Sequence, residues 1–412
     1  MRQSAIWVVL LLLLSCLALV TCAREALPNT AGDGERTVPK LSQDGKYLLD
    51  LQSGVFKVTR LPGTDSVLDF SVQKGQVVED FIWSPQSDAF AYHTRYEESG
   101  GTCGVYIVSL DGSSEKVADL ERPDLGSRQM LWSPCGRYLF WDKPFSVYDR
   151  ETGTTLVKSD IDQDYAFVRS PLFSNDSSKL AFTLFEREGP ENLWVLDLED
   201  CGVRKVTNEG AGDYPFFWVD DTEILVRIGA VSTGGGHVYG LAAIDLETGS
   251  RVVVDVEESS SNGVDGPGAR RLNIAKSISP DGEHIVGVSR SGAGTESRIY
   301  VLELETGRRE VILKGETPGE GYGLAQCLWT KEDQMLLSVG KESYDDDSRD
   351  SQDRYQIIQC STGSGCHLLV ESGTELSLLG VVDNRLYYVE LSESKPLRSV
   401  PLEQERFREF RK

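Results

Sequence analysis

Short segments in which apolar and polar residues alternate recur along most of the chain, separated by turns rich in Gly, Asp and Pro. The stretches "SISPDGEHIVGVS" at 277–289 and "IYVLELETGRREVIL" at 299–313 each contain one such turn between two alternating segments. Alternation with a period of two is typical of a β-strand, and Ser-Pro-Asp-Gly favours a tight turn because Pro fixes φ and Gly accepts positive φ. The pattern therefore predicts short antiparallel strands joined by hairpin turns.

The turn recurs at near-regular spacing. Its first position is occupied, in eight successive copies, by Ser42, Ser84, Ser133, Ser174, Val219, Ser279, Thr330 and Val381. The intervals between these positions are 42, 49, 41, 45, 60, 51 and 51 residues. Repeats of this length with four strands each are typical of β-propeller blades, which bury both faces only when stacked around an axis. We therefore expect an all-β protein in which residues 38–412 form a β-propeller of four-stranded antiparallel blades, with eight blades favoured over seven.

Several copies resemble a known repeat. The segments "WSPCGRYLFWD" at 132–142 and "FSNDSSKLAFTLF" at 173–185 are similar to the WD40-like repeats of TolB-type propellers, also found in the non-catalytic propeller of prolyl-oligopeptidase-type peptidases. The resemblance covers about residues 38–412, although the first repeat begins near Val38 and leaves no obvious separate N-terminal domain of the TolB kind. It implies that the short "SPDG" and "DLETG" turns share one face and the long loops share the other.

The N-terminus has the layout of an export signal, because Arg2 precedes an apolar run at 5–20. The segment "LVTC" resembles a bacterial lipobox, although Thr21 stands where Gly, Ala or Ser is usual. We expect a lipoprotein-type signal at 1–22 with lipidation of Cys22, a flexible polar linker at 23–37, and a membrane-anchored lipoprotein at the cell envelope. Lipidation of Cys16, cleavage after Ala23 to give a periplasmic or secreted protein, and an uncleaved anchor are the alternatives.

Charge and motif content narrow the function. With 65 acidic and 42 basic side chains the net charge is −23, which disfavours nucleic acid as a partner. The sequence contains no G-x-S-x-G nucleophile motif, and its four histidines include no pair at metal-ligand spacing. The acidic segments "DIDQDY" at 160–165 and "YDDDSRD" at 344–350 lack the glycine and distal glutamate of an EF-hand. We therefore expect neither a cofactor nor a metal, and interpret these segments as solvated loops.

The long loops are the expected place of binding, because a rigid scaffold holds loops that vary from blade to blade. Aromatic and Arg side chains dominate interface energetics, so the candidate contacts are Arg95, Tyr96, Trp141, Tyr165, Tyr214, His237, Arg270, Arg271, Arg290 and Tyr322. Each of them also fits packing on neighbouring loops or simple solvation, and core packing is a strong alternative for Trp141. Cys360 and Cys366 flank a tight turn in "IIQCSTGSGCHLL", where they fit either a disulfide across a hairpin or two free thiols.

These observations favour a monomeric, non-catalytic exported scaffold that binds a protein or peptide in the cell envelope through the long-loop face. An enzyme, either a hydrolase or a lyase, with its site at the channel mouth is one alternative, and a carbohydrate- or Ca²⁺-binding module is another. An enzyme is expected to gather titratable groups with perturbed pKa values at one end of the channel. A protein binder is expected to expose an apolar or aromatic patch on the long-loop face.

Overall fold

The computed structural model describes residues 38–63, 65–96, 103–120, 129–157, 165–186, 191–208, 212–232, 237–258, 278–290, 297–314, 320–330, 334–343, 354–361, 365–392 and 397–402. The predicted signal, Cys22, the linker and the pair Arg270 and Arg271 lie outside these residues. Every regular element within them is a β-strand. A helix of the length and hydrophobicity needed to cross a membrane is absent from this part of the chain.

The strands form eight antiparallel sheets, numbered here as blades 1 to 8 in chain order. Blades 1 and 2 contain β1 (Lys40–Leu41), β2 (Tyr47–Gln52), β3 (Val55–Arg60), β4 (Ser66–Ser71), β5 (Gln76–Trp83), β6 (Ala89–Tyr96), β7 (Cys103–Ser109) and β8 (Ser114–Leu120). Blades 3 and 4 contain β9 (Met130–Trp132), β10 (Tyr138–Asp142), β11 (Phe145–Asp149), β12 (Thr154–Val157), β13 (Tyr165–Phe173), β14 (Lys179–Glu186), β15 (Asn192–Asp197) and β16 (Val203–Lys205).

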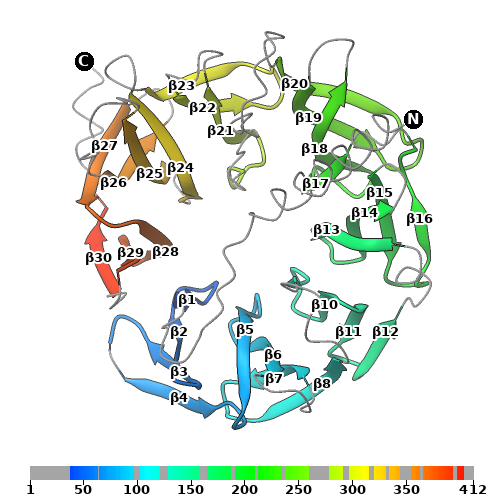
Figure 1. The fold of residues 1–412 in the computed structure, drawn as a ribbon, viewed down its shortest axis with the longest axis vertical. Coiled ribbons are helices and arrows are strands. Elements are labelled where there is room, and N and C mark those ends of the chain that lie inside the picture. The colour runs from blue at the N-terminus through cyan, green and yellow to red at the C-terminus, as the bar shows by residue number, and fades with distance from the viewer. Residues whose placement is uncertain are drawn as a thin grey trace, which may run out of the picture.

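The second half of the chain repeats this arrangement. Blades 5 and 6 contain β17 (Asp213–Trp218), β18 (Glu223–Ser232), β19 (His237–Asp245), β20 (Arg251–Glu258), β21 (His284–Arg290), β22 (Ser297–Glu303) and β23 (Arg309–Lys314). Blades 7 and 8 contain β24 (Glu320–Trp329), β25 (Gln334–Ser343), β26 (Arg354–Ser361), β27 (Gly365–Ser372), β28 (Leu376–Val382), β29 (Arg385–Glu390) and β30 (Leu397–Pro401). Figure 1 shows the sheets arranged in a ring, which confirms the predicted propeller and its eight blades. Blades 6 and 8 show three strands each among the described residues.

The hydrophobic core lies between neighbouring blades. Phe140 and Phe145 of blade 3 belong to one apolar cluster with Phe182 of blade 4, and all three side chains are fully buried. The ring centroids of Phe145 and Phe182 are 4.9 Å apart. A single blade could not bury these side chains on both of its faces, so each blade depends on its neighbours for stability.

The turns between the first and second strands of the blades contact one another. The N–H of Asp44 in blade 1 donates to Ser87 Oγ of blade 2 (3.2 Å), and the N–H of Cys135 in blade 3 donates to Ser177 Oγ of blade 4 (3.0 Å). These turns therefore share one side of the ring, which we call the short-turn face. Because antiparallel strands reverse direction at each turn, the loops between second and third strands lie on the opposite side, the long-loop face.

Blades 1 and 8 close the ring, as Figure 1 shows for β1–β4 and β28–β30. A Cβ atom added to Gly45 would lie 2.8 Å from Val382 Cγ2 of blade 8, and one added to Gly380 would lie 2.6 Å from Leu41 Cδ2 of blade 1. These glycines allow the first and last blades to approach closely. The ends of the propeller are therefore joined by close packing between the sheets of blades 1 and 8.

Gly45→Ala is expected to destabilise this closure. Gly45 has φ +74, where an L-residue costs about 1–2 kcal/mol, and the clash with Val382 adds about 1–3 kcal/mol. Gly54→Ala is the matched control, because Gly54 has φ +75 and nothing within 4 Å of the added Cβ. Thermal unfolding of both variants measures the difference, and equal losses would mean that the contact between blades 1 and 8 is loose.

Candidate functional site

The predicted contact residues occupy strand ends at the long-loop face. Four of them lie at or near the end of a strand: Arg95 and Tyr96 in β6, Trp141 in β10 and Arg290 in β21. The other four lie at or near the start of a strand: Tyr165 in β13, Tyr214 in β17, His237 in β19 and Tyr322 in β24. The side chains that the structure describes among them are those of Arg95, Trp141 and Tyr214.

Trp141 is a core residue. Its side chain is 1% exposed and belongs to the apolar cluster between blades 2 and 3, together with Ala91, Val105 and Leu139. Trp141 therefore packs in the core, as the alternative interpretation of the sequence has it, and its side chain is not available for direct contact with a partner. The aromatic side chain fits the core because β10, the strand in which it lies, carries buried apolar residues on both faces.

A first cluster of charged side chains bridges blades 2 and 3 beneath the long-loop face. His93 of β6 is 1% exposed, and its Nδ1 lies 3.2 Å from Glu79 Oε2 of β5. Glu79 lies in a register shift of β5 between Val78 and Asp80, and such a bulge re-aims a side chain. The other carboxylate oxygen of Glu79 lies 3.6 Å from Arg95 Nε, whose side chain is 30% exposed. Arg95 is thus held at the surface by a carboxylate that also contacts a buried histidine.

Asp142 adds a second carboxylate to this cluster, which we call the blade 2–3 cluster. Its side chain is 6% exposed, and its Oδ1 accepts a hydrogen bond from the N–H of Gln129 (2.9 Å). Burial raises the pKa of Asp142 to about 6, although the Gln129 N–H and the charges of Lys143 and His93 act in the opposite direction. A buried acid with a raised pKa is typical of functional sites, but it also occurs in structural ion-pair networks.

A second cluster joins blades 4 and 5. Glu191 precedes β15, and its Oε1 lies 3.1 Å from Arg169 Nη1 of β13. The phenol of Tyr214 on β17 donates a hydrogen bond to Glu191 Oε2. Burial and the hydrogen bond to Glu191 together raise the pKa of Tyr214 to about 12, so this side chain remains a neutral donor. Arg227 lies over its ring, 5.3 Å from the centroid.

This blade 4–5 cluster also presents a guanidinium group to solvent. The Arg169 side chain is 48% exposed, whereas its partner Glu191 is 15% exposed. In both clusters, a largely buried carboxylate therefore fixes an arginine that reaches the surface. Sequence reasoning selected Arg95 and Tyr214 but missed Glu79, His93, Asp142, Arg169 and Glu191. Polar residues within otherwise apolar strands, such as His93 in "FAYHTRY", are the signal that could have indicated them.

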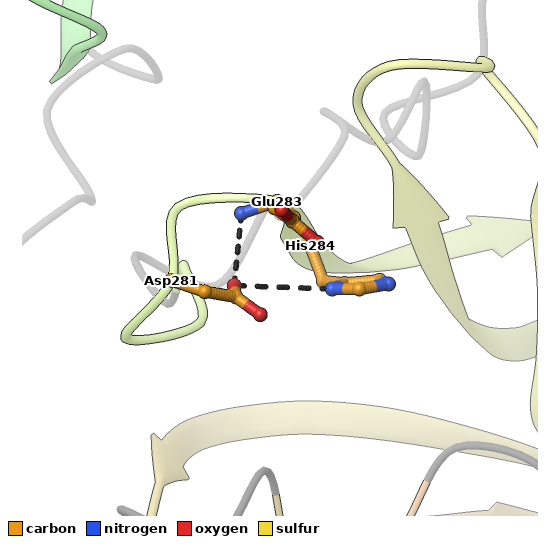
Figure 2. Close-up of side chains that lie close together, drawn as sticks. All are labelled: Asp281, Glu283 and His284. Carbon is orange, nitrogen blue, oxygen red and sulfur yellow. Dashed lines mark hydrogen bonds and ion pairs between the residues drawn. The ribbon is translucent and has the colours of Figure 1, made fainter.

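Asp281, Glu283 and His284 are the one group of three metal-ligand side chains within reach of each other in the described part of the chain. Figure 2 shows that they lie in a single short turn. The Oδ1 of Asp281 accepts hydrogen bonds from the Ser279 hydroxyl and the Glu283 N–H, the latter at 2.9 Å, and lies 3.9 Å from His284 Nδ1. The turns at Asp44 and Asp176 have the same Ser–Asp bond, so this arrangement belongs to the repeat and does not indicate a metal site.

Cys360 and Cys366 form a disulfide across β26 and β27, where they occupy paired positions. The acidic segment at 344–350 lies outside the described residues, as do 160–164 of the other one. Neither acidic segment is therefore tested as an ion site.

No protein-family model matches the sequence, and no curated protein matches it. Among solved structures, a TolB protein from Acinetobacter baumannii is 15% identical, with 81% of this chain and 78% of that chain covered and a TM-score of 0.37. An oligogalacturonate lyase in complex with manganese is 12% identical over 78% of this chain and 88% of that chain, with a TM-score of 0.51. A prolyl endopeptidase is 10% identical over 87% of this chain and 55% of that chain, with a TM-score of 0.50. At these identities the likeness concerns the fold alone, and the fold is that of a β-propeller.

Proposed function

We propose that this propeller is an exported scaffold of the cell envelope that binds a protein or peptide partner through its long-loop face. The observation that carries the proposal is the pair of clusters described above, in each of which a largely buried carboxylate holds a partly exposed arginine. Arg and Tyr are enriched among the side chains that contribute most to binding. A side chain fixed before binding also loses less conformational entropy in the complex.

The contrast between the two faces supports the same conclusion. On the short-turn face, the carboxylates of Asp44, Asp176 and Asp281 are engaged by the Ser hydroxyl of their own turn. These hydrogen bonds stabilise the turn of each repeat. On the long-loop face, the charged groups differ from blade to blade, as specific recognition requires. Arg95 and Arg169 favour carboxylates on the partner, which a chain with a net charge of −23 would otherwise repel.

The proposed location rests on the sequence. The apolar run at 5–20 after Arg2 is typical of an export signal, and Cys22 is the proposed lipid anchor. Mass spectrometry of the protein recovered from a bacterial envelope measures both features. A mature N-terminus at Cys22 carrying acyl chains would support the anchor, whereas an unmodified N-terminus at Arg24 would support a periplasmic or secreted form.

The Arg95→Ala, Arg169→Ala double variant is expected to weaken partner binding. Removal of two central side chains of this kind costs about 1–2 kcal/mol each, which corresponds to about a tenfold loss in affinity for each. The partner is first captured from solubilised envelope and identified, and its Kd is then measured with purified components. Lys46→Ala is the control, because Lys46 is 69% exposed on the short-turn face. Equal affinities of the two variants would exclude the long-loop face as the binding surface.

An enzyme with its site at the same end of the channel is the second candidate, and the raised pKa of the buried Asp142, on which His93 acts electrostatically, is the observation that favours it. The two side chains are 6% and 1% exposed, so a substrate does not reach them in this conformation. That burial is the reason for preferring a binding role. Turnover of a substrate that is abolished by Asp142→Asn, with the fold retained, would reverse this preference.

A further inference from the structure

The blade 2–3 cluster and the blade 4–5 cluster are both built around a shared carboxylate. In the blade 4–5 cluster, Glu191 contacts the guanidinium of Arg169 through one oxygen and the phenol of Tyr214 through the other. In the blade 2–3 cluster, one oxygen of Glu79 faces an arginine and the other faces the imidazole of His93. Histidine side chains commonly change charge between pH 5 and pH 8, whereas the phenol, with a pKa of about 12, stays neutral there. The two clusters therefore differ in their expected response to protons.

The imidazole of His93 is enclosed and poorly satisfied. Its side chain is 1% exposed, and neither ring nitrogen has a hydrogen-bond partner among the described residues. Buried polar groups are normally hydrogen-bonded, so an unpaired buried ring is a costly arrangement. The Nδ1 atom lies 3.2 Å from Glu79 Oε2, within the range of an ion pair. Protonation of the ring would convert this contact into a charge-assisted one.

The charged side chains around His93 are ordered by depth. The carboxylates are the deeper ones, since Glu79 is largely buried and Asp142 of blade 3, on which the charge of His93 acts, is buried. The cations lie nearer to the surface, because both Arg95 and Lys143 are only half-buried. A positive charge on His93 is therefore placed beside the buried anions, where the exclusion of water strengthens the attraction.

Further titratable groups lie at the same junction. Asp80, which is paired with His93 in β5, bonds to a lysine of blade 1 at 2.8 Å. On the other side, β7 places an apolar residue opposite the histidine. The apolar cluster between blades 2 and 3 adds the thiol of Cys103 and the phenol of Tyr148. Glu79 contacts the ring directly, so its position depends most on the charge of His93.

The shared carboxylate holds Arg95 only loosely. The Nε atom of Arg95 lies 3.6 Å from Glu79 Oε1, which is beyond hydrogen-bond length. The equivalent contact of Arg169 in the blade 4–5 cluster is shorter, at 3.1 Å. A partly exposed ion pair contributes little stability, so a second cation that competes for Glu79 can displace Arg95 from it.

We propose that the blade 2–3 cluster is a proton-operated switch, in which protonation of His93 draws the Glu79 carboxylate inward and frees Arg95 from it. The proton comes from water and returns to it when the pH rises. Burial raises the pKa of Asp142 to about 6, so this carboxylate also takes up a proton in mild acid and competes with the histidine. An arginine that is no longer fixed loses more conformational entropy on binding, so acid is expected to weaken partner binding. This last step rests on the proposed function, whereas the release of Arg95 does not.

The test is the rate at which phenylglyoxal, an arginine-specific reagent, modifies Arg95 in the folded chain at pH 8 and at pH 5.5, mapped by mass spectrometry. The rate is divided by that of Arg169 in the same sample. This reference is needed because the reagent slows in acid at every arginine, and it is suitable because the phenol of Tyr214 stays neutral at both pH values. We expect the ratio to be about two- to fivefold higher at pH 5.5, as the loss of a partly exposed ion pair allows.

Variants separate the switch from a general effect of acid. His93→Gln leaves this position uncharged at both pH values, so the ratio is expected to stay constant. Glu79→Gln removes the anion that holds Arg95, so the ratio is expected to be high at pH 8 already. Asp142→Asn takes a negative charge away from the surroundings of His93, so a lower pH is expected to be needed for the same rise.

Two results would overturn the switch. One is a ratio in the parent chain that does not change with pH. The other is an equal rise in His93→Gln, which would assign the release to protonation of Glu79 itself. His93→Phe, which keeps a ring at this position, takes the place of His93→Gln if that variant does not fold.

The link to partner binding is tested separately. The Kd of the captured partner is measured at both pH values and is expected to rise about two- to fivefold in acid for the parent chain, but not for His93→Gln. A ratio that rises while the Kd stays constant would keep the switch and overturn its role in binding. If no partner is captured, the proposed function fails, and the modification ratio still decides whether the switch exists.

Discussion

Asp142→Asn is expected to raise the free energy of unfolding at pH 7.5 by about 2–3 kcal/mol and to change it little at pH 4. The reason is the cost of a buried charge. Burial raises the pKa of Asp142 from 3.8 to about 6 in the folded chain, whereas the unfolded chain keeps the ordinary value. Between pH 4 and pH 6 the folded state therefore binds the proton more tightly than the unfolded state does.

The sign of the pH dependence follows from linkage. The stabilising effect of the protonated Asp142 is fully present below pH 4 and is lost as the pH rises through 6. Above pH 6 the folded chain carries a buried carboxylate, which the uncharged amide of Asn avoids. The amide also keeps an oxygen that accepts the hydrogen bond from Gln129. The quantity to measure is the difference in unfolding free energy between variant and parent at each pH, since other groups titrate equally in both.

Asp149→Asn is the matched control, with the opposite sign. Asp149 is also buried, but Arg137 donates two hydrogen bonds to its carboxylate, at 2.9 and 2.6 Å, and lowers its pKa. The substitution is expected to destabilise the chain at pH 7.5 and to lose its effect in strong acid. If Asp142→Asn also destabilised the chain at pH 7.5, the carboxylate would have favourable partners that compensate for its burial, and the blade 2–3 cluster would be a structural ion network.

The fold could be predicted from the sequence because its determinants are local and repeated. Each short turn consists of residues adjacent in the chain, such as Ser279 and Asp281, and the alternating strands follow directly from it. Eight copies therefore gave the number of blades. In blade 6, which has three described strands, an isolated antiparallel bridge between Ile278 and Ile285 marks the place of a further strand.

The candidate site could be predicted only in part, because its contacts join different blades. Arg95 and Tyr214 were selected by residue type, and both lie in charged clusters. Their partners were not selected, because the pairing of Arg169 with Glu191 depends on the positions of β13 and of the loop before β15. Trp141 shows the converse error: an aromatic residue near a loop can be core when the neighbouring blade covers it.

The contacts between neighbouring short turns show a third relation between sequence and structure. The string "WSPCGRY" is a recognisable copy of the turn. Its Cys135 N–H donates a hydrogen bond to Ser177 Oγ of the next blade, 42 residues further along the chain. Only the stacking of the blades brings the two turns together, so this bond could not be inferred from the repeat alone.

Arg251→Ala is expected to cause the largest loss of stability, about 3–5 kcal/mol. The carboxylate of Asp213, at the start of β17, is fully buried, and Arg251 Nη2 lies 2.7 Å from both of its oxygens. The backbone carbonyl of Asp213 also accepts a hydrogen bond from Thr183 of blade 4. Removal of the guanidinium group leaves a buried negative charge without its cationic partner where blades 4 and 5 meet.

Three further variants identify the cause of that loss. Arg251→Lys keeps the charge but not the planar fork, so an intermediate loss is expected. The double variant Asp213→Asn, Arg251→Ala removes both charges. It is expected to be more stable than Arg251→Ala alone, because it leaves no unpaired carboxylate in the core. Arg308→Ala removes an arginine that is 74% exposed beside Glu303, and should change the stability by no more than about 0.5 kcal/mol. Chemical unfolding of the four variants measures their free energies of unfolding and so identifies the cause. If the double variant were as unstable as Arg251→Ala, Arg251 would stabilise the junction between blades 4 and 5 through its packing. The other contacts of Asp213 would then be sufficient to compensate for the burial of its charge.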